Sequence, residues 1–320
     1  MNKFLVIQTA FIGDVILATS VVEKLHQFYP ESKIDFLLRK GNEGLLENHP
    51  IINEVIIWDK KNKKLDNLKA ITKSVKKSQY DVVINLHRHA SSGLITAFSG
   101  AKQKIGFKKN PLSFSYTKKV EHNIGDGTHE VERNQQLIAD LTDKGFAVPK
   151  LYPVNKDYSS VEALKKEGYV CMAPTSVWFT KQLPKEQWVN LIGKINDKLV
   201  IYLLGGSDDA DQCENIKLLS KNKNVVNLSG KLSFLESAAL MQNAKMNYVN
   251  DSAPLHIASA MNAPVTAYFC STDPSFGFGP LSDNKTIIEV KVKLKCKPCG
   301  YHGKKECSEG HFDCGFKIEV

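Results

Sequence analysis

An apolar strand gives way to a capped helix in Val249-Asn250-Asp251-Ser252-Ala253-Pro254-Leu255-His256. The apolar run begins at Met246, Asp251 or Ser252 is a favourable N-cap, and Pro254 suits the first helical turn. The unpaired N–H groups and the positive dipole end of such a helix attract anions such as phosphate. An ordinary capped helix has the same pattern, so its meaning depends on the surrounding sequence.

The length and charge of the chain limit the kind of protein it can be. Its 320 residues suffice for two hydrophobic cores, so we expect two domains. Residues 1–150 carry 23 Lys and Arg against 16 Asp and Glu, whereas residues 151–320 carry 20 against 18. The excess positive charge of the first half is therefore expected to face an anion, such as nucleic acid, an acidic membrane surface or a phosphorylated small molecule. A solvated lysine-rich surface would have the same charge. No apolar run is long enough for a membrane span or signal peptide, which predicts a cytoplasmic protein.

Strands alternate with helices through the first half. The predicted strands are Phe4–Ile7, Lys33–Leu38, Glu54–Trp58 and Asp81–Leu86. Helices are predicted near 15–29, 43–48 and 65–77, and from about 126 to 144. This alternation predicts right-handed crossovers and a parallel sheet with both faces covered.

Polar residues follow the predicted strands, at the sheet edge where α/β proteins bind ligands. They are Gly13 and Asp14 after the first strand, Arg88 after the fourth, and Lys108 and Lys109 after the next. A single glycine excludes a dinucleotide fingerprint, and no Gly-Lys-Ser/Thr follows to make a P-loop. Only Arg39, Arg88 and Arg133 among the 43 basic residues are arginine, the residue suited to bidentate anion recognition. Arg88 and Arg133 are therefore candidates for anion binding.

The alternation restarts after a predicted linker at 145–160. Its strands are Tyr169–Ala173, Leu199–Leu204, Val225–Leu228, the strand that ends at Asn250, and Pro264–Phe269, which is expected to close the sheet. Helices are predicted at 185–195 and 211–219, and from Ser233 with a capping box to Glu236. The fold class is therefore α/β, with two doubly wound domains, 1–150 and 151–320, facing each other across a cleft.

Short motifs recur in a characteristic order along most of the chain. They are Ile12–Thr19, His129–Arg133, Lys181–Pro184, Leu204–Gly206, Leu228–Gly230, Asn250–Ser252 with His256, and Thr272–Pro274 followed by Gly279–Pro280. From Lys3 to Pro280 the chain resembles the bacterial heptosyltransferases of lipopolysaccharide core assembly, glycosyltransferase family 9. This resemblance implies the GT-B fold of two Rossmann-like domains.

The resemblance also implies an activity and its substrates. The expected reaction is an inverting, metal-independent transfer of heptose from ADP-heptose to an inner-core acceptor, Kdo- or heptosyl-lipid A. Residues 1–150 would bind this anionic acceptor, consistent with their charge, and residues 151–320 the nucleotide sugar. The protein would work at the inner face of the membrane, with no nucleic acid partner. Oligomeric state is not predicted.

Individual roles follow from the same resemblance. Asp14 matches the family's general base, and Lys181 matches the lysine that contacts the diphosphate, where no Asp-x-Asp metal motif is present. The implied donor-binding residues are Thr175, Ser176, Thr180, Asp251, Ser252, Ala253 and His256, and the implied acceptor-binding residues are Gly13, Arg88, Lys108, Lys109 and Arg133. Most relatives have glycine at the position of Ala253, which matters if the backbone there needs positive φ. Lys108 and Lys109 could equally be a solvated pair, and Arg133 a structural bridge to Glu130.

Four of the seven cysteines cluster in a tail at 296–314. Cys296, Cys299, Cys307 and Cys314 begin with a Cys-x2-Cys pair, half of a zinc site, although the second pair is spaced too widely for a standard knuckle. We expect a small structural zinc site that braces the tail, with free thiols and disulfides as the alternatives. No cofactor is expected for catalysis.

Two rival functions are left open. One is a GT-B enzyme that uses another nucleotide sugar, because the motifs locate the diphosphate but not the base or the sugar. The other is a non-catalytic homologue that binds sugar nucleotide or lipopolysaccharide, against which Asp14 and Lys181 argue. A dehydrogenase is disfavoured because the glycine fingerprint is missing.

Overall fold

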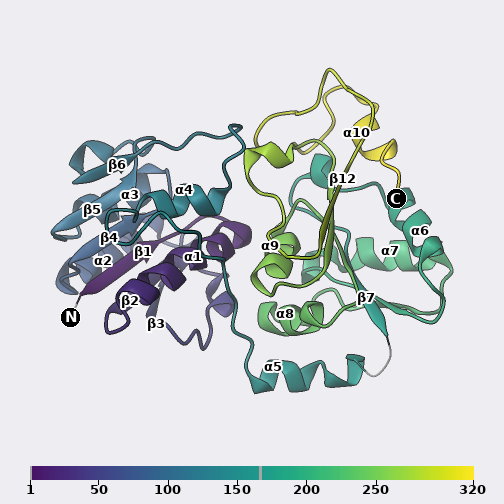
Figure 1. The fold of residues 1–320 in the computed structure, drawn as a ribbon, viewed down its shortest axis with the longest axis horizontal. Helices are drawn as coiled ribbons and strands as arrows, with labels where there is room; N and C mark the ends of the chain where they lie inside the picture. Colours follow the sequence, from purple (N-terminus) through teal and green to yellow (C-terminus); the bar gives the residue numbers. More distant parts are fainter. Residues whose placement is uncertain (1, 166–167) are drawn as a thin grey trace. The chain divides into compact units, whose positions relative to one another are not determined.

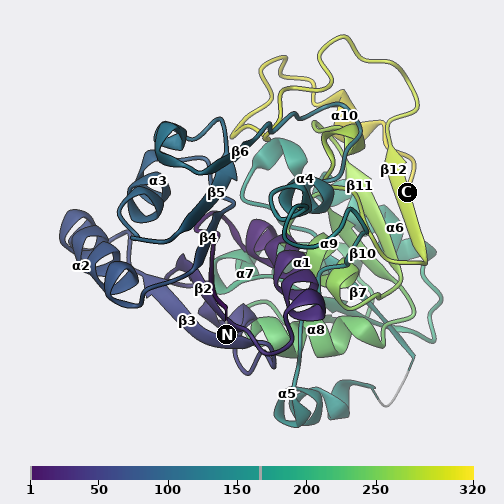
Figure 2. The same ribbon diagram turned by 60° about the vertical axis from the view of Figure 1, so that its left-hand side comes forward.

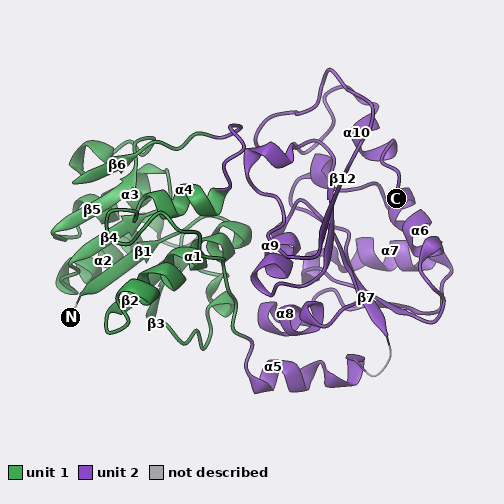
Figure 3. Ribbon diagram, viewed as in Figure 1, with its two compact units in different colours: residues 1–123, 130–152 green, residues 124–129, 153–320 purple. Residues whose placement is uncertain are grey.

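The computed structural model describes residues 2–165 and 168–320, which form two compact units (Figure 3). Unit 1 holds residues up to 123 and 130–152; unit 2 holds 124–129 and 153–320. Assignment of the short segment 124–129 to unit 2 was not predicted. Its long-range hydrogen bonds explain it, because Gly127 N donates to Ser275 O over 3.2 Å and His129 Nε2 lies 3.1 Å from Gly279 O.

Unit 1 is built on a six-stranded parallel sheet of order β3-β2-β1-β4-β5-β6. Its strands are β1 (Lys3–Ile7), β2 (Lys33–Arg39), β3 (Ile52–Trp58), β4 (Val82–Asn85), β5 (Gln103–Phe107) and β6 (Lys118–Val120). The helices α1 (Ile12–Phe28) and α4 (Glu130–Gln136) cover one face, and α2 (Lys64–Lys77) and α3 (Ala90–Ala97) the other (Figures 1 and 2). Short 3₁₀ turns are η1 (Glu43–Leu45) and η2 (Ser113–Ser115).

Unit 2 repeats this plan with the order β12-β11-β10-β7-β8-β9, again all parallel. Its strands are β7 (Tyr169–Ala173), β8 (Val200–Leu203), β9 (Val225–Asn227), β10 (Asn247–Asn250), β11 (Val265–Phe269) and β12 (Lys285–Glu289). Helices α6 (Lys185–Lys194) and α7 (Ala210–Ser220) cover one face, and α8 (Phe234–Gln242) and α9 (Ala253–Ala260) the other (Figure 1). The remaining elements are α5 (Asn155–Ser160), α10 (Asp313–Phe316) and the 3₁₀ turns η3 (Glu162–Lys165), η4 (Phe179–Lys181), η5 (Ser207–Asp209) and η6 (Pro274–Phe276).

Both strand orders are those of a Rossmann-like, doubly wound sheet. The strand order reverses between the first and fourth strands of each unit, and this place is called the switch point. In unit 1, Ile7 of β1 lies opposite Asn85 of β4, so the loops that carry Asp14 and Arg88 leave the same edge of the sheet. In unit 2, Val249 of β10 lies opposite Ala173 of β7. Each unit therefore presents some of its predicted site residues at its own switch point, Asp14 and Arg88 in unit 1 and Thr175 and Asp251 in unit 2, as expected for the GT-B class.

Several local predictions are confirmed and others are wrong. The capping box of α8 is present: Ser233 Oγ accepts from Glu236 N over 3.1 Å, and Ser233 N donates to Glu236 Oε2 over 2.7 Å. The helix predicted at 126–144 is much shorter, and the predicted linker contains α5. Strand β11 was predicted to be the last strand, but the edge strand of the unit 2 sheet, next to β11, is β12. This strand was missed because three of its five residues are polar, as an exposed edge strand allows.

None of the described helices combines the length and the apolar character needed to cross a bilayer.

Candidate functional site

Asp14 lies in the first turn of α1, just beyond the carboxyl end of β1. Its Oδ2 accepts a hydrogen bond from Phe11 N over 3.1 Å, so the carboxylate also closes the start of the helix. The side chain is half-buried. Gly13, the preceding residue, is half-buried in the same turn. Capping and catalysis can coexist here, because one carboxylate oxygen stays available for a substrate proton.

The surroundings of Asp14 favour a protonated carboxyl to an unusual degree. Burial and then the negative charge of Glu130 raise the pKa of Asp14 to about 6, while the Phe11 hydrogen bond and the charge of Arg88 oppose the rise. A carboxylate with this pKa is a stronger base than an exposed aspartate and is still ionised at neutral pH. Asp14 therefore has the properties of a general base.

Arg133 is buried in an internal cluster. Its side chain is only 2% exposed, and its Nε donates to Glu130 Oε2 over 2.8 Å. His122 Nε2 lies 3.0 Å from the same oxygen. Burial alone would raise the pKa of Glu130, but its interactions with His122 and Arg133 hold that pKa below its ordinary value. The structure thus favours the structural bridge over direct acceptor contact for Arg133.

Two cations that the sequence analysis did not select lie beside Asp14 and Arg88. Arg39 ends β2 and Lys60 follows β3, so both reach the same edge of the sheet. Lys60 Nζ donates to Thr9 O over 2.7 Å, and burial, Arg39 and Lys64 lower its pKa to about 8. Burial lowers the pKa of Arg39, and the charge of Asp14 only partly opposes this shift. Applying the strand-end rule to β2 and β3 would have found both residues.

Lys108 and Lys109 lie where predicted, directly after β5, and are exposed. Lys108 Nζ lies 2.6 Å from Glu121 Oε1, and both side chains are more than half exposed. Such a pair contributes little to stability and is easily rearranged by a ligand. In the structure Lys108 therefore forms a solvated ion pair with Glu121 at the predicted ligand-binding edge of the sheet.

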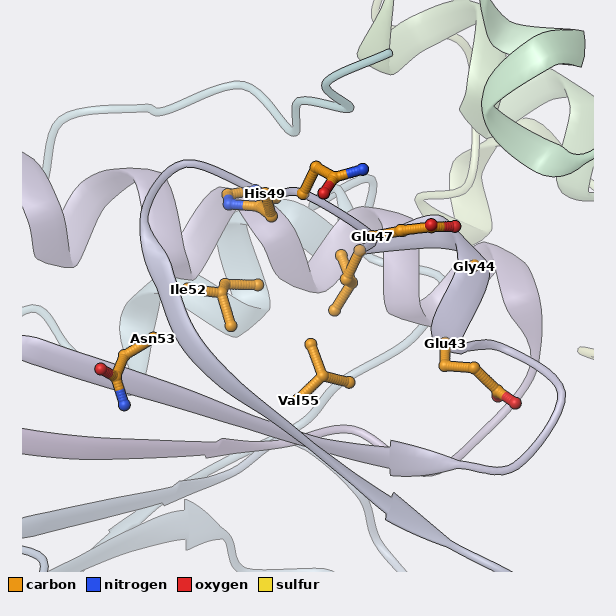
Figure 4. Close-up of a pocket in the computed structure, with 9 residues that line it drawn as sticks. Glu43, Gly44, Glu47, His49, Ile52, Asn53 and Val55 are labelled. Atoms are coloured by element: carbon orange, nitrogen blue, oxygen red, sulfur yellow. The ribbon is translucent and has the colours of Figure 1, made fainter. Parts of the chain in front are cut away.

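A pocket of about 400 Å³ lies elsewhere in unit 1, between η1 and the start of β3. Ile52 and Val55 face the hollow, while the carboxylates of Glu43 and Glu47 lie at its rim (Figure 4). Its lining contains none of the predicted site residues. Its acidic rim also makes it unsuited to a phosphorylated ligand.

In unit 2, Lys181 and Asp251 form a close ion pair at the switch point. Lys181 Nζ lies 2.7 Å from Asp251 Oδ2, with side-chain exposures of 17% and 6%. Thr272 Oγ1 donates to the same carboxylate oxygen over 2.7 Å. The pair joins η4 to the loop between β10 and α9. It holds an ammonium group beside the amino end of a helix, where an anion would bind.

The amino end of α9 differs in detail from the prediction. Ser252 is the N-cap, but among the described residues its hydroxyl makes no capping hydrogen bond. Ala253 begins the helix and is not among the residues with positive φ, so the alanine causes no backbone strain there. His256 is 5% exposed, and its Nδ1 has no hydrogen-bond partner within the described ranges. Burial lowers the pKa of His256 to about 3, against the opposing charge of Asp251, so this ring is neutral at pH 7.

The turn after β7 is only partly available to a ligand. Thr175 and Asp251 each lie two residues beyond a paired strand end, so they leave the sheet together. Ser176 O accepts from Gln182 Nε2 over 2.7 Å. Thr180, however, is 1% exposed, and its Oγ1 lies 2.9 Å from Ser271 Oγ and 2.8 Å from Lys304 N. In the structure the Thr180 hydroxyl is therefore engaged in internal hydrogen bonds, and its contact with the donor stays a prediction.

The four tail cysteines, for which a structural zinc site is predicted, lie in one region. Burial and then the charges of Cys299, Cys307 and Cys296 raise the pKa of Cys314 to about 12, with Lys297 opposing. All four are free thiols. Within residues 2–165 and 168–320, no three His, Cys, Asp or Glu side chains are arranged to hold a metal ion. One reason is that Cys314 lies in the core of unit 2, whereas the others are only half-buried.

Known proteins match the chain over most of its length. Lipopolysaccharide heptosyltransferase 3 of Escherichia coli K12 is 29% identical, over 85% of this chain and 83% of that protein. Lipooligosaccharide heptosyltransferase 2 of Haemophilus influenzae is 26% identical, over 94% of each chain.

Solved structures agree with the fold. E. coli ADP-heptose lps heptosyltransferase II matches with a TM-score of 0.80 at 20% identity, covering 93% of this chain and 95% of that one. E. coli heptosyltransferase WaaC with ADP matches with a TM-score of 0.72 at 20% identity, covering 89% and 92%. The profile of glycosyltransferase family 9 (heptosyltransferase) matches residues 68–312. The chain belongs to glycosyltransferase family 9, the heptosyltransferases, and is a glycosyltransferase.

Proposed function

We propose that this enzyme is an inverting, metal-independent heptosyltransferase that moves heptose from ADP-heptose to the Kdo- or heptosyl-lipid A acceptor of the lipopolysaccharide inner core. Unit 1 binds the acceptor, and unit 2 binds the nucleotide sugar. The observation that carries the proposal is Asp14, a half-buried carboxylate with a pKa of about 6 at the switch point of unit 1. The curated relatives are lipopolysaccharide and lipooligosaccharide heptosyltransferases, which supports the choice of sugar and acceptor.

The first step takes place at Asp14. Its carboxylate accepts the proton of an acceptor hydroxyl as the hydroxyl oxygen attacks the anomeric carbon of the donor. The bond from that carbon to the β-phosphate oxygen breaks, and the electron pair leaves with ADP. Attack on the face opposite the leaving group inverts the configuration, so no covalent sugar–enzyme intermediate forms.

The leaving diphosphate is stabilised by unit 2. Lys181 exchanges its Asp251 partner for the diphosphate, and the N–H groups at the start of α9 face the same charge. Asp251 is then free to accept hydrogen bonds from sugar hydroxyls. His256 supplies a neutral ring whose Nδ1 has no hydrogen-bond partner among the described residues. Thr175, Ser176, Ser252 and Ala253 complete the donor-binding turn.

The acceptor is anionic, and unit 1 offers cations to match. Arg88, Arg39 and Lys60 lie at the edge that carries Asp14, with Lys108 and Lys109 beyond β5. The positive charge of this unit also favours attraction to an anionic membrane surface, where the lipid-linked acceptor is found. We therefore place the enzyme at the inner face of the membrane, as a peripheral protein.

Thermal stabilisation by a panel of nucleotide sugars tests the donor. We expect ADP-linked sugars and ADP to raise the melting temperature, by an amount equivalent to about 2.7 kcal/mol at a hundredfold excess over Kd. UDP- and GDP-linked sugars should have little effect. A preference for UDP or GDP would instead support the GT-B enzyme with another donor. Binding of ADP-heptose without turnover of any core acceptor would support the non-catalytic homologue.

Metal removal tests the electrostatic part of the mechanism. Because Lys181 and the α9 N–H groups take the place of a divalent cation, a strong chelator should leave turnover unchanged. Dependence on added magnesium would contradict the proposal.

The tail zinc site stays a prediction: metal analysis of the purified protein should find one zinc per chain if the four cysteines rearrange to bind it, and none if they remain free thiols.

A further inference from the structure

Residues 297–304 of the tail lie directly against the turn that carries Lys181. Thr180 N donates to Lys304 O over 3.1 Å, and Lys304 N donates to Thr180 Oγ1 over 2.8 Å. The Thr180 hydroxyl also lies 2.9 Å from Ser271 Oγ. This two-way bridge joins the residue next to Lys181 to a segment more than a hundred positions later in the chain. All three hydrogen bonds are shielded by burial of Thr180, which strengthens them.

The 297–304 segment is fixed at its other end as well. Cys299 N donates to Ser271 O over 2.9 Å. Lys297 Nζ donates to Phe269 O over 2.9 Å and lies 2.6 Å from Glu289 Oε1. The segment is therefore anchored to the carboxyl ends of β11 and β12 before it reaches Thr180. A segment held at both ends can serve as a rigid wall for the side chains it contacts.

Gly303 is the part of this wall that touches Lys181. A Cβ atom at Gly303 would lie 2.6 Å from Lys181 Cγ and 2.6 Å from Trp178 Cβ. Both distances are shorter than real Cβ contacts, so only glycine lets the backbone come this close. Gly303 is buried and is not among the glycines with positive φ. Glycine is therefore needed here for space and not for backbone conformation.

We infer that Gly303, held by the Thr180–Lys304 bridge, is a positioning residue that fixes the stem of Lys181 and so places its ammonium group for the donor diphosphate. A free lysine side chain loses much rotamer entropy when it binds. Packing of Gly303 on Cγ removes part of that loss in advance. This inference rests on the proposed function, since it assumes that Lys181 contacts the diphosphate.

Gly303→Ala tests the contact. The added methyl group should displace the Lys181 stem, so we expect kcat to fall roughly 10- to 100-fold with a smaller rise in the donor KM. The effect on kcat should exceed the effect on KM, because Lys181 acts mainly on the charge that develops in the transition state. Gly193→Ala in α6 is the matched control: it is exposed, no described atom lies within 4 Å of the added Cβ, and kcat should be unchanged.

Thr180 variants test the bridge separately from the glycine. Thr180→Val removes the acceptor for Lys304 N and should lower kcat in the same direction, whereas Thr180→Ser keeps the hydroxyl and should restore it. Rescue by serine would not be expected if Thr180 acted only by filling space. Equal kcat values for the valine and serine variants would overturn the role of the bridge.

ADP affinity separates positioning from simple damage to the fold. In otherwise unchanged protein, Gly303→Ala should weaken ADP binding about tenfold. After Lys181→Ala, which removes Cγ, the same glycine change should add little, because the two effects share one cause. An equal loss in both backgrounds, or unchanged ADP affinity and kcat for Gly303→Ala alone, would overturn the inference. Failure of ADP to bind the unmodified enzyme would instead count against the proposed donor.

Discussion

Asp14→Asn is expected to abolish most transferase activity, with a fall in kcat of about 10²- to 10⁴-fold, the usual contribution of a general base. The asparagine amide keeps the size of the side chain and can still accept the hydrogen bond from Phe11 N, so the start of α1 should survive. It cannot take a proton from the acceptor hydroxyl. Steady-state transfer of heptose to a core acceptor measures the loss, and the melting temperature should change little.

A matched control separates the base from the helix start. Asp66 also lies in the first turn of a helix, α2, but is exposed. Asp66→Asn should leave kcat unchanged. If Asp14→Asn kept more than a tenth of the original kcat, Asp14 could not be the base, and its capping hydrogen bond would be its main role.

The pH dependence of the same reaction follows from two pKa shifts. Burial and Glu130 raise the pKa of Asp14 to about 6, so activity should fall below pH 6 as the base becomes protonated. Burial and neighbouring cations lower the pKa of Lys60 to about 8, so its attraction for an anionic acceptor should fade above pH 8. A bell-shaped kcat/KM for the acceptor is therefore expected. Arg88→Gln removes a cation that holds the Asp14 pKa down, which should move the acid limb to higher pH.

The alternation of buried strands and helices was enough to predict the α/β class and to place Asp14 and Asp251 after strand ends. Both predictions follow from local patterns, since apolar runs and helix starts are encoded within a few residues. The short α4 and the polar β12 were not predictable in this way. Their limits depend on tertiary contacts, such as the segment 124–129 binding to unit 2 and an edge strand that needs few apolar residues.

The site was predicted less completely than the fold, because its contacts join residues that are far apart in the sequence. Lys181 and Asp251 were both selected, but the ion pair between them joins positions 70 residues apart. Thr180 was expected to bind the donor from the family resemblance, and no local signal reveals its hydrogen bond to Lys304, which is 124 residues away. Lys60 was missed although it follows β3, because lysines are too common in this chain to stand out. Arg39 is one of only three arginines, and applying the strand-end rule to β2 would have found it.

The second large effect is expected for Lys181→Met, with kcat reduced by about 10²- to 10³-fold, the usual cost of losing one electrostatic stabiliser of a developing anion. Methionine keeps the unbranched stem that packs on Gly303, so the loss reports the charge. Lys181→Arg keeps a cation and should retain more activity than Lys181→Met. The exposed Lys185 at the start of α6 provides the matched control, and Lys185→Met should behave like the unmodified enzyme.

Stability must be separated from catalysis in this variant, because Lys181→Met leaves the buried Asp251 without its cation. An unpaired buried charge commonly costs about 3–5 kcal/mol of unfolding free energy. Adding Asp251→Asn removes that charge while the amide can still accept from Thr272. The double variant should therefore recover most of the lost stability in thermal unfolding, yet transfer heptose no faster than Lys181→Met. If activity returned together with stability, the ammonium group would be a structural partner of Asp251 and not a ligand of the diphosphate.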